Sequence, residues 1–428
     1  MNQFDPIVAA GIVITLAAIF AYANERWLQF PETIGLMVVA MIITLLLVLV
    51  GVLNPRMVEL AREFVEQIDF NATLMHGMLG FLLFAGALHV KLDDLAEQKW
   101  VVTITATFGV IGSTLLVGIL AHYILLALGI SMSWLNCLLF GALISPTDPI
   151  SVLGIMKKIG APKSLATKIS GESLFNDGVG VVVFLVILGA ATGASDVTVS
   201  QVGLLLLQEV GGGVLLGFLL GGIAFYLHRT VESVHVELLI SLAVVAGGYP
   251  LALALHCSGP IAMVVAGLLI GNPGRRHAMG EKVRVQVDAL WEMIDEVLNA
   301  ILFVLLGLEV IVLAWRQEFL FAGFMMIPVV LFSRFVTIGA AVTALRRFRV
   351  FSPRVIRILT WGGLRGGISV ALALSIPMTL EATDQTQTFP ARNLILVMTY
   401  VVVVFSIVVQ GLTIGPYIRR SLSIPTES

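Results

Sequence analysis

Two stretches decide the fold: LLFGALISPTDPISVLGIM at residues 138–156 and LTWGGLRGGISVALALSIP at residues 359–377. Each is apolar at both ends and interrupted in the middle, by SPTDP with Asp148 in the first and by GGLRGG with Arg365 in the second. Proline removes a backbone donor and collides with the preceding helical turn, whereas glycine weakens a helix through its conformational freedom. We therefore predict two helices that are unwound near their centres and carry an ionisable residue there.

The composition places these stretches in a membrane. Hydrophobic residues make up 58% of the 428 residues and charged residues only 12%, whereas soluble domains carry about 25% charged residues. The apolar residues occur in runs of about 20, which is the length of a membrane-spanning helix, and not in the ~10-residue alternating segments of a barrel. The sequence therefore predicts an all-α polytopic membrane protein in contact with a lipid bilayer. It has no basic stripe for a nucleic acid, and we expect no cofactor.

Polar and Pro/Gly-rich breaks divide the chain into about thirteen predicted spans. Their approximate limits are 5–22, 32–53, 71–90, 99–128, 133–156, 165–192, 199–228, 235–255, 259–272, 283–314, 319–345, 353–379 and 391–418.

The basic residues predict the orientation of these spans. Nineteen of them fall in loops on one side and four in loops on the other, where Arg56, Arg62, Arg316 and Arg392 lie. Cytoplasmic loops collect Lys and Arg. We therefore predict that the N-terminus lies outside and the C-terminus in the cytoplasm.

The two interrupted spans are the fifth and the twelfth, so they cross the membrane in opposite directions. This is the pattern of two inverted six-helix repeats, spans 1–6 and 8–13, joined by span 7. A matched pair of broken helices is the best sequence indicator of a transporter's binding site at the membrane midplane. We predict crossed discontinuous helices, with ordinary kinks as the alternative.

Ionisable residues inside a membrane are costly and by default functional. Here there are three acids, Asp148, Glu172 and Asp177, and two bases, Arg334 and Arg365. One negative charge is left without a counterpart. That carboxylate is the natural site for a cation or a proton.

The stretch GESLFNDGVGVVVF, residues 171–184, indicates which acid this is. Residues four apart share a helical face, so Ser173 and Asp177 can converge on one ion. Glu172 and Asn176 are also four apart and share another face. Glu172 points roughly 140° away from Asp177. We expect an arginine partner for Glu172, because a lone buried carboxylate would instead take up a proton.

These positions predict an exchange mechanism. The carboxylate of Asp177, the hydroxyl of Ser173 and freed carbonyls near Thr147 are hard oxygen ligands that suit a monovalent cation. A carboxylate partly removed from water also binds a proton more tightly. If Asp177 holds either H⁺ or a cation but not both, alternating access gives electroneutral one-for-one exchange. Asn176 beside it adds a dipole and no charge.

Three alternatives compete with this interpretation. Glu172 and Asp177 could merely cap a helix, since Ser and Asp favour that position, but a cap does not explain two arginines in other spans. A passive cation channel is the rival transport class. An intramembrane hydrolase needs a second catalytic group, and none is found.

Five motifs occur in order along the chain: SPTDP, GESLFNDGVGVVVF, GPIAMVVAGLLIGN, LNAILFVLLGLEV and WGGLRGGISVALALSIP. Together they resemble the monovalent cation–proton antiporters of the NhaP and NHE kind, from roughly the second to the twelfth span. The resemblance implies a secondary transporter rather than an enzyme. The short chain beyond Arg420 favours the bacterial type, a multi-pass protein of the cytoplasmic (inner) membrane.

The resemblance also implies an architecture and a partner. We expect a homodimer in which each protomer forms one transporter domain, residues 1–428, and works as an elevator. Spans 1–3 and 7–10, about residues 5–90 and 199–314, would form the dimerisation scaffold. Spans 4–6 and 11–13, about residues 99–192 and 319–418, would form the ion-binding core.

Site roles follow from the same resemblance. It implies that Asp177 binds the cation and the proton, that Asn176 is the neutral member of the "ND" pair, and that Glu172 pairs with Arg334. Asparagine in that pair goes with electroneutral exchange. The residues implied to complete the site, with Arg365 at the helix crossing near Asp148, are Thr147, Asp148 and Ser173.

One position departs from the family. Many relatives carry a glutamate in an LLFEA stretch of the third span, where this chain has FLLFAGALHV with Ala85. An acid that helps complete the cation shell in those relatives is absent. Na⁺ is the first expectation, with Li⁺ or a K⁺/H⁺ antiporter of the same fold as alternatives.

Two groups of polar residues remain undecided by sequence. Glu237, Asp295, Glu296 and Glu309 either line the cytoplasmic funnel or stabilise an interface. The His228, Glu232 and His235 trio has helical metal-ligand spacing, but a solvated turn is the preferred interpretation.

Overall fold

The structure is a computed structural model that describes residues 6–51, 54–193, 203–205, 207–231, 233–275, 279–313, 315–347, 351, 354–380 and 390–422. It is almost wholly helical, and no β-strand occurs in these residues. Nine helical stretches within them are long and apolar enough to cross a membrane. The prediction of an all-α, multi-pass membrane protein is confirmed, whereas the total of thirteen spans and the inverted repeat stay predictions.

The described part of each predicted span coincides with one helix or with two or three consecutive helical segments. The bounds are α1 (Pro6–Ala23), α2 (Glu32–Gly51), α5 (Leu79–His89), α6 (Leu92–Ala106), α7 (Phe108–Ala127), α8 (Trp134–Ile144), α9 (Ile150–Lys158), α10 (Lys163–Ala191), α12 (Gly212–Thr230), α13 (Val234–Ala254), α14 (Gly259–Leu269), α16 (Glu281–Leu308), α17 (Gln317–Leu345), α18 (Val355–Trp361), α19 (Gly367–Ser375), α20 (Ala391–Phe405) and α21 (Gly411–Leu422).

Two local features were not predicted. The fourth apolar run is two helices, α6 and α7, separated at Thr107, whose hydroxyl donates to the Thr103 carbonyl at 2.6 Å. Such back-bonding by threonine often bends a helix. The segment left as an outside loop between the second and third spans contains an amphipathic helix, α3 (Pro55–Gln67), which is followed by the short α4 (Phe70–Ala72) and the π-helical turn η2 (Thr73–Met78). Its apolar residues come at helical spacing among many charges, which is why a hydropathy criterion alone passes over it.

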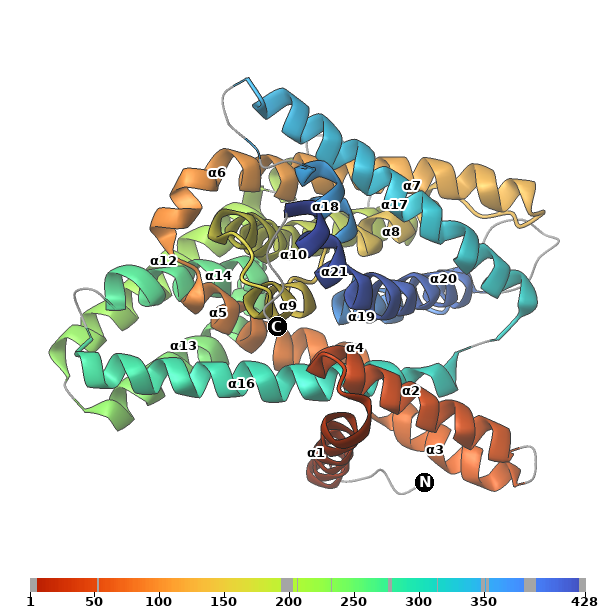
Figure 1. Cartoon of the computed structure of the whole chain (residues 1–428), viewed down its shortest axis with the longest axis horizontal. Helices are drawn as coiled ribbons and strands as arrows, with labels where there is room; N and C mark the ends of the chain where they lie inside the picture. The colour runs from red at the N-terminus through yellow and green to blue at the C-terminus, as the bar shows by residue number, and fades with distance from the viewer. Residues whose placement is uncertain are drawn as a thin grey trace.

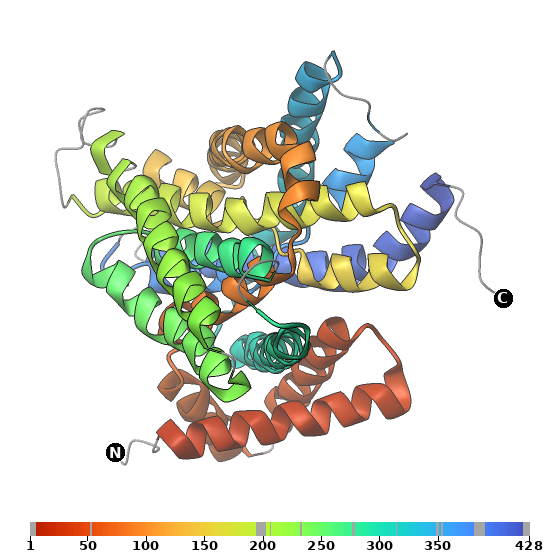
Figure 2. The same ribbon diagram turned by 90° about the vertical axis from the view of Figure 1, so that its left-hand side faces the viewer.

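The helices are grouped below by the predicted scaffold and core, a division that stays a prediction. In the first, the scaffold group, α16 packs against α1, α2 and α5, while α12, α13 and α14 pack on one another. In the second, the core group, α7 packs against α8 and α17, α10 against α6 and α8, and α17 against α20. Figure 1 shows α16 running along the scaffold below the core helices. Figure 2 shows α16 nearly end-on, between the N-terminal helices and the rest of the molecule.

The two groups meet beside the broken helices. α19 contacts α4, η2 and α16, and α10 contacts α5 and α14. Polar bonds join the two groups, from the Asn71 Nδ2 to the Ala371 carbonyl at 2.6 Å and from the Tyr400 hydroxyl to the Leu306 carbonyl at 2.7 Å. The site described next therefore lies in the core group, against the scaffold.

Candidate ion-binding site

The two interruptions form the centre of the site. Residues 145–149 separate α8 from α9, and residues 362–366 separate α18 from α19. The two extended segments cross and pair as an antiparallel bridge, with the Asp148 N–H donating to the Leu364 carbonyl at 2.8 Å. Crossed discontinuous helices were predicted, and the structure shows them at the predicted positions.

Arg365 caps the end of α8. Its Nη1 donates to the carbonyls of Ser145 and Pro146, at 2.7 Å for the latter, and its side chain is fully buried. These carbonyls follow the last residue of α8, where the helix dipole leaves partial negative charge and acceptors without a helical donor. Arg365 thus lies at the helix crossing, in the segment that pairs with Asp148.

The first break is held to α10 through Thr147. The Ser173 hydroxyl donates to the Thr147 carbonyl and lies 3.0 Å from the Thr147 hydroxyl. The Asn176 amide donates to the Thr147 hydroxyl at 2.8 Å and accepts from the Thr147 N–H at 3.3 Å. These bonds of Asn176 were not predicted from the sequence. Its spacing of three residues from Ser173 indicates that the two residues lie on neighbouring positions of one helical face, but not that both contact Thr147.

Asp177 lies one helical turn beyond Ser173 and faces a cavity. Its side chain is buried, and it makes no hydrogen bond or ion pair within the described part of the chain. The Asp148 carboxylate is close enough to interact with it through space, and both residues line the same cavity. α10 begins at Lys163 and runs on to Ala191. The helix-cap alternative is therefore wrong, because Glu172 and Asp177 lie more than two turns inside the helix.

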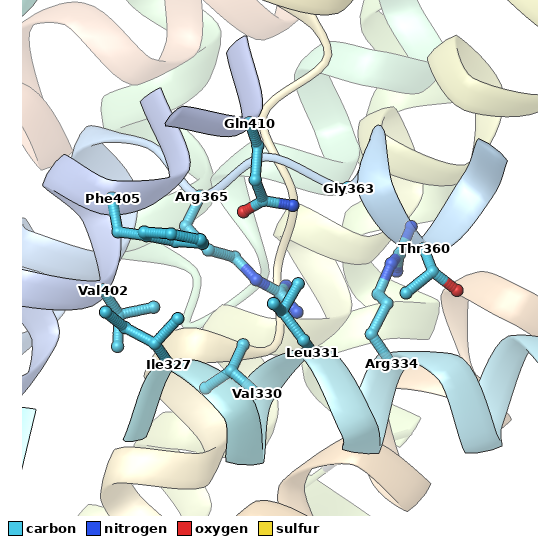
Figure 3. A pocket seen from close by; sticks show the side chains of 10 residues that line it. All are labelled: Ile327, Val330, Leu331, Arg334, Thr360, Gly363, Arg365, Val402, Phe405 and Gln410. Carbon is cyan, nitrogen blue, oxygen red and sulfur yellow. The ribbon is translucent and has the colours of Figure 1, made fainter. Parts of the chain in front are cut away.

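Glu172 points away from the cavity and meets Arg334. Arg334 Nη1 lies 2.6 Å from Glu172 Oε1, and both side chains are buried. Arg365 also interacts with Glu172 through space. Figure 3 shows Arg334 extending from α17 toward the turn that holds Gly363, with Arg365 on the far side of a cavity of about 10 Å³. The two arginines and Glu172 form a charged cluster inside the core.

Glycines in the second break leave room for charged side chains. A Cβ atom at Gly363 would collide with the Arg334 guanidinium, and one at Gly366 would lie 2.7 Å from Asp148 Oδ2. The sequence analysis explained the glycines by helix weakening alone. Close approach of a side chain to backbone is a second reason for glycine there.

A cavity of about 1020 Å³ leads to Asp177. Its lining includes Lys91, Lys157 and Lys163, which belong to loops predicted to be cytoplasmic, and Thr147 in the first break. Asp295 and Glu296 of α16 line it too, with Glu292 on the same helical face. Of the two alternatives for Asp295 and Glu296, lining a funnel or stabilising an interface, their place in the cavity wall agrees with the first.

The other undecided residues lie elsewhere. His228 and Glu237 are buried between α12 and α13, with Nδ1 and Oε2 3.0 Å apart. The interpretation of His228 as part of a solvated turn is wrong, because its side chain is fully buried and its Nδ1 is paired with Glu237. Glu232 lies outside the described residues. Glu309 is buried at the opposite end of α16, in the short helix η5 (Glu309–Val312).

Crossed broken helices, a buried carboxylate and a cavity that reaches it define a membrane transporter with its site at the discontinuous helices. Comparison with known proteins gives the family. A sequence model described as "Sodium/hydrogen exchanger, transmembrane" matches residues 13–420. The chain belongs to this family, which comprises transporters rather than enzymes.

Two curated relatives and one solved structure show the extent of the similarity. The chain is 48% identical to the Na⁺/H⁺ antiporter NhaP of Pseudomonas aeruginosa, over 97% of this chain and 96% of that protein. It is 30% identical to the Na⁺/H⁺ antiporter NhaH of Halobacillus dabanensis, over 98% and 99%. The sodium proton antiporter MjNhaP1 from Methanocaldococcus jannaschii, solved at pH 8, has the same fold, with a TM-score of 0.72, 20% identity and coverage of 97% and 99%.

Proposed function

We propose that the protein is a secondary antiporter that exchanges a monovalent cation, first of all Na⁺, for H⁺. The observation that carries this proposal is the Asp177 carboxylate. This carboxylate lines the large cavity, as Thr147 does, and Ser173, which contacts Thr147, lies one helical turn before it. It makes no hydrogen bond or ion pair within the described residues. The relatives named as Na⁺/H⁺ antiporters support the same exchange.

Asp177 would bind either ion in competition. A cation would be held by the carboxylate together with the Thr147 and Ser173 oxygens, with Asp148 as an additional acidic neighbour. A proton on Asp177 removes the charge that attracts the cation. Because one carboxylate serves both ions, binding of one displaces the other, and the exchange would be one for one and electroneutral.

The remaining charges support this assignment. Glu172, Arg334 and Arg365 interact with one another in the core, and Arg365 also caps α8. Asp148 lies at the crossing beside them. Counted together, these two acids and two bases balance, which leaves Asp177 as the unbalanced acid.

Alternating access would be of the elevator type. The core, about residues 99–192 and 319–418, would move against the scaffold, about residues 5–90 and 199–314, which would also form the interface of a homodimer. The cavity that reaches Asp177 is lined by Lys91, Lys157 and Lys163. This side is the cytoplasm in a bacterial inner membrane with the N-terminus outside, and the structure then corresponds to an inward-facing state.

A K⁺/H⁺ antiporter of the same fold is the second candidate. The observation that favours it is Ala85, which lines the cavity where many relatives carry an acid. Loss of that acid lowers the charge density of the site, and this disfavours the smaller, more strongly hydrated Na⁺. The channel alternative has no comparable support.

The test uses purified protein in liposomes with a pH-sensitive dye. Addition of Na⁺, Li⁺ or K⁺ to vesicles with an acidic interior should dissipate the pH gradient. An unchanged gradient with all three cations would contradict the proposal. Cation currents without proton movement would instead indicate the passive channel.

A further inference from the structure

Asn299 is a buried amide whose oxygen has no hydrogen-bonded partner. It lies on α16 and is 2% exposed, and its Oδ1 makes no hydrogen bond within the described residues. A buried polar group that lacks its partner destabilises the folded protein, because its contact with water is not replaced. Such groups are rare in folded proteins and call for an explanation, for example a ligand.

The amide is aimed at the ion cavity. Asn299 lines the same cavity as Asp177, Thr147 and Asp148. It continues the face of α16 on which Glu292, Asp295 and Glu296 also line that cavity, since the four residues lie at helical spacing.

The charges around it are acidic. Asp295, one turn before Asn299, interacts through space with Asp148, Glu292 and Glu296. The NH₂ group of Asn299 is directed to the Asp295 carboxylate, which leaves the Asn299 Oδ1 as the unpartnered atom. Asp148 belongs to the core group and Asp295 to the scaffold group, so the acids of the two groups face each other across the cavity. A cation in this space reduces their mutual repulsion.

Ala85 lines this cavity as well. It lies on α5, which packs directly against α16. The wall near α5 and α16 therefore has no carboxylate at position 85 and has a neutral amide at position 299. Amide oxygens are ligands for hard cations in proteins.

We propose that Asn299 is a specificity-determining ligand of the transported cation, contributed by the scaffold. This proposal rests on the proposed function and deepens it. The Asn299 Oδ1 binds the partly hydrated cation while Asp177 faces the cavity, and the contact is lost when the core moves away. A neutral ligand adds affinity without adding a group that titrates, so the one-for-one exchange is kept.

The experiment compares cation KM and maximal rate in proteoliposomes for Na⁺, Li⁺ and K⁺. We expect Asn299→Ala to raise the Na⁺ KM by about tenfold, with a maximal rate within about twofold of the wild type. Asn299→Asp, which keeps an oxygen and adds charge, should lower the Na⁺ KM below that of Asn299→Ala. It should also shift preference toward Na⁺ over K⁺.

A merely structural amide gives a different result. The control is Leu298→Ala, a neighbouring change on α16 at a residue that does not line the cavity. It should leave the Na⁺ KM unchanged even if the yield falls. If Asn299→Ala shows the wild-type KM for every cation, or only a lower rate with an unchanged KM, the inference is overturned.

Two further measurements distinguish a failure of this inference from a failure of the proposed antiport. If Asn299→Ala does not fold, Asn299→Ser replaces it, because its hydroxyl is smaller and should give an intermediate KM. An Na⁺-dependent rise in melting temperature, measured in detergent, should also need higher Na⁺ in Asn299→Ala. Loss of exchange in the wild-type protein would contradict the proposed antiport, whereas wild-type exchange with unchanged Asn299 variants would contradict this inference alone.

Discussion

The two broken helices have the same architecture and different chemistry. The α8–α9 break contains prolines and presents Thr147 and Asp148 to the cavity, whereas the α18–α19 break contains glycines and presents Arg365 to the protein interior. Each supplies what the other lacks. Arg365 of the second caps the carbonyls that end α8, and the Leu364 carbonyl of the second accepts the Asp148 N–H of the first.

This difference separates ion chemistry from scaffolding within one charged cluster. Carboxylate and hydroxyl groups that face the cavity would bind ions, while arginines turned inward neutralise acids and helix ends. The division runs through α10 itself, where Asp177 faces the cavity and Glu172, five residues earlier, meets Arg334. Substitutions on the two sides should therefore affect different properties, transport on one and stability on the other.

The largest effect on transport is expected at Asp177. Asp177→Asn keeps the shape of the side chain and removes the charge for which the two ions compete. We expect exchange to fall below detection in the proteoliposome assay, with a melting temperature close to that of the wild type. Persistent Na⁺-dependent dissipation of the pH gradient would show that another acid, with Asp148 the first to examine, binds the ions.

The largest effect on stability is expected at the inward-facing pair. Arg334→Ala strands Glu172 in a buried site, which costs roughly 3–5 kcal/mol. Glu172→Ala strands Arg334 in the same way. Thermal or denaturant unfolding in detergent should show both variants less stable than Asp177→Asn.

The double variant Glu172→Ala/Arg334→Ala sharpens this result. Because it leaves neither charge alone, we expect it to be more stable than the sum of the two single changes implies. If the loss of stability in the double variant equals the sum of the losses in the two single variants, the pair is not coupled. Equal melting temperatures for Glu172→Ala, Arg334→Ala and Asp177→Asn would lead to the same conclusion.

A smaller effect is expected from methyl groups in the second break. Gly366→Ala would place Cβ 2.7 Å from Asp148 Oδ2, and Gly363→Ala would press on Arg334. Overpacking of this kind costs about 1–3 kcal/mol. We expect Gly366→Ala to slow exchange more than it lowers stability, because it displaces a cavity-facing acid, and Gly363→Ala to do the reverse.

Gly189→Ala is the matched control for these two variants. Gly189 lies in α10, and a Cβ there would meet nothing within 4 Å. Its substitution should be neutral or slightly stabilising, because alanine has the higher helix propensity. If all three glycine variants behave alike, the space around residues 363 and 366 has no special role.

Local chemistry is enough to predict the two helix breaks and the multi-pass helical fold, whereas the binding roles of the site residues stay predictions. Proline interrupts a helix wherever it lies inside one, and four-residue spacing puts Ser173 and Asp177 on one face in any helix. The contacts of Asn176 with Thr147 were out of reach, because they depend on how α10 packs against a segment that is not helical. The same holds for Gly366 against Asp148 and for the buried His228–Glu237 pair. Tertiary packing decides each of these.

The smallest expected effect is that of membrane potential on the exchange rate, and it reports how much net charge crosses the membrane in each cycle. If Asp177 alone exchanges one cation for one proton, no net charge crosses the membrane, and an imposed K⁺/valinomycin potential should leave the Na⁺/H⁺ exchange rate unchanged. This measurement uses wild-type protein and compares inside-negative with inside-positive vesicles. Asn176→Asp provides a comparison, because it places a second carboxylate next to Asp177 and gives the transported site an additional charge. A potential-dependent rate in the wild type would mean that a second acid titrates during the cycle, and Asp148, which interacts with Asp177 through space, is the first to examine. The balance assigned to Asp148, Glu172, Arg334 and Arg365 would then be wrong.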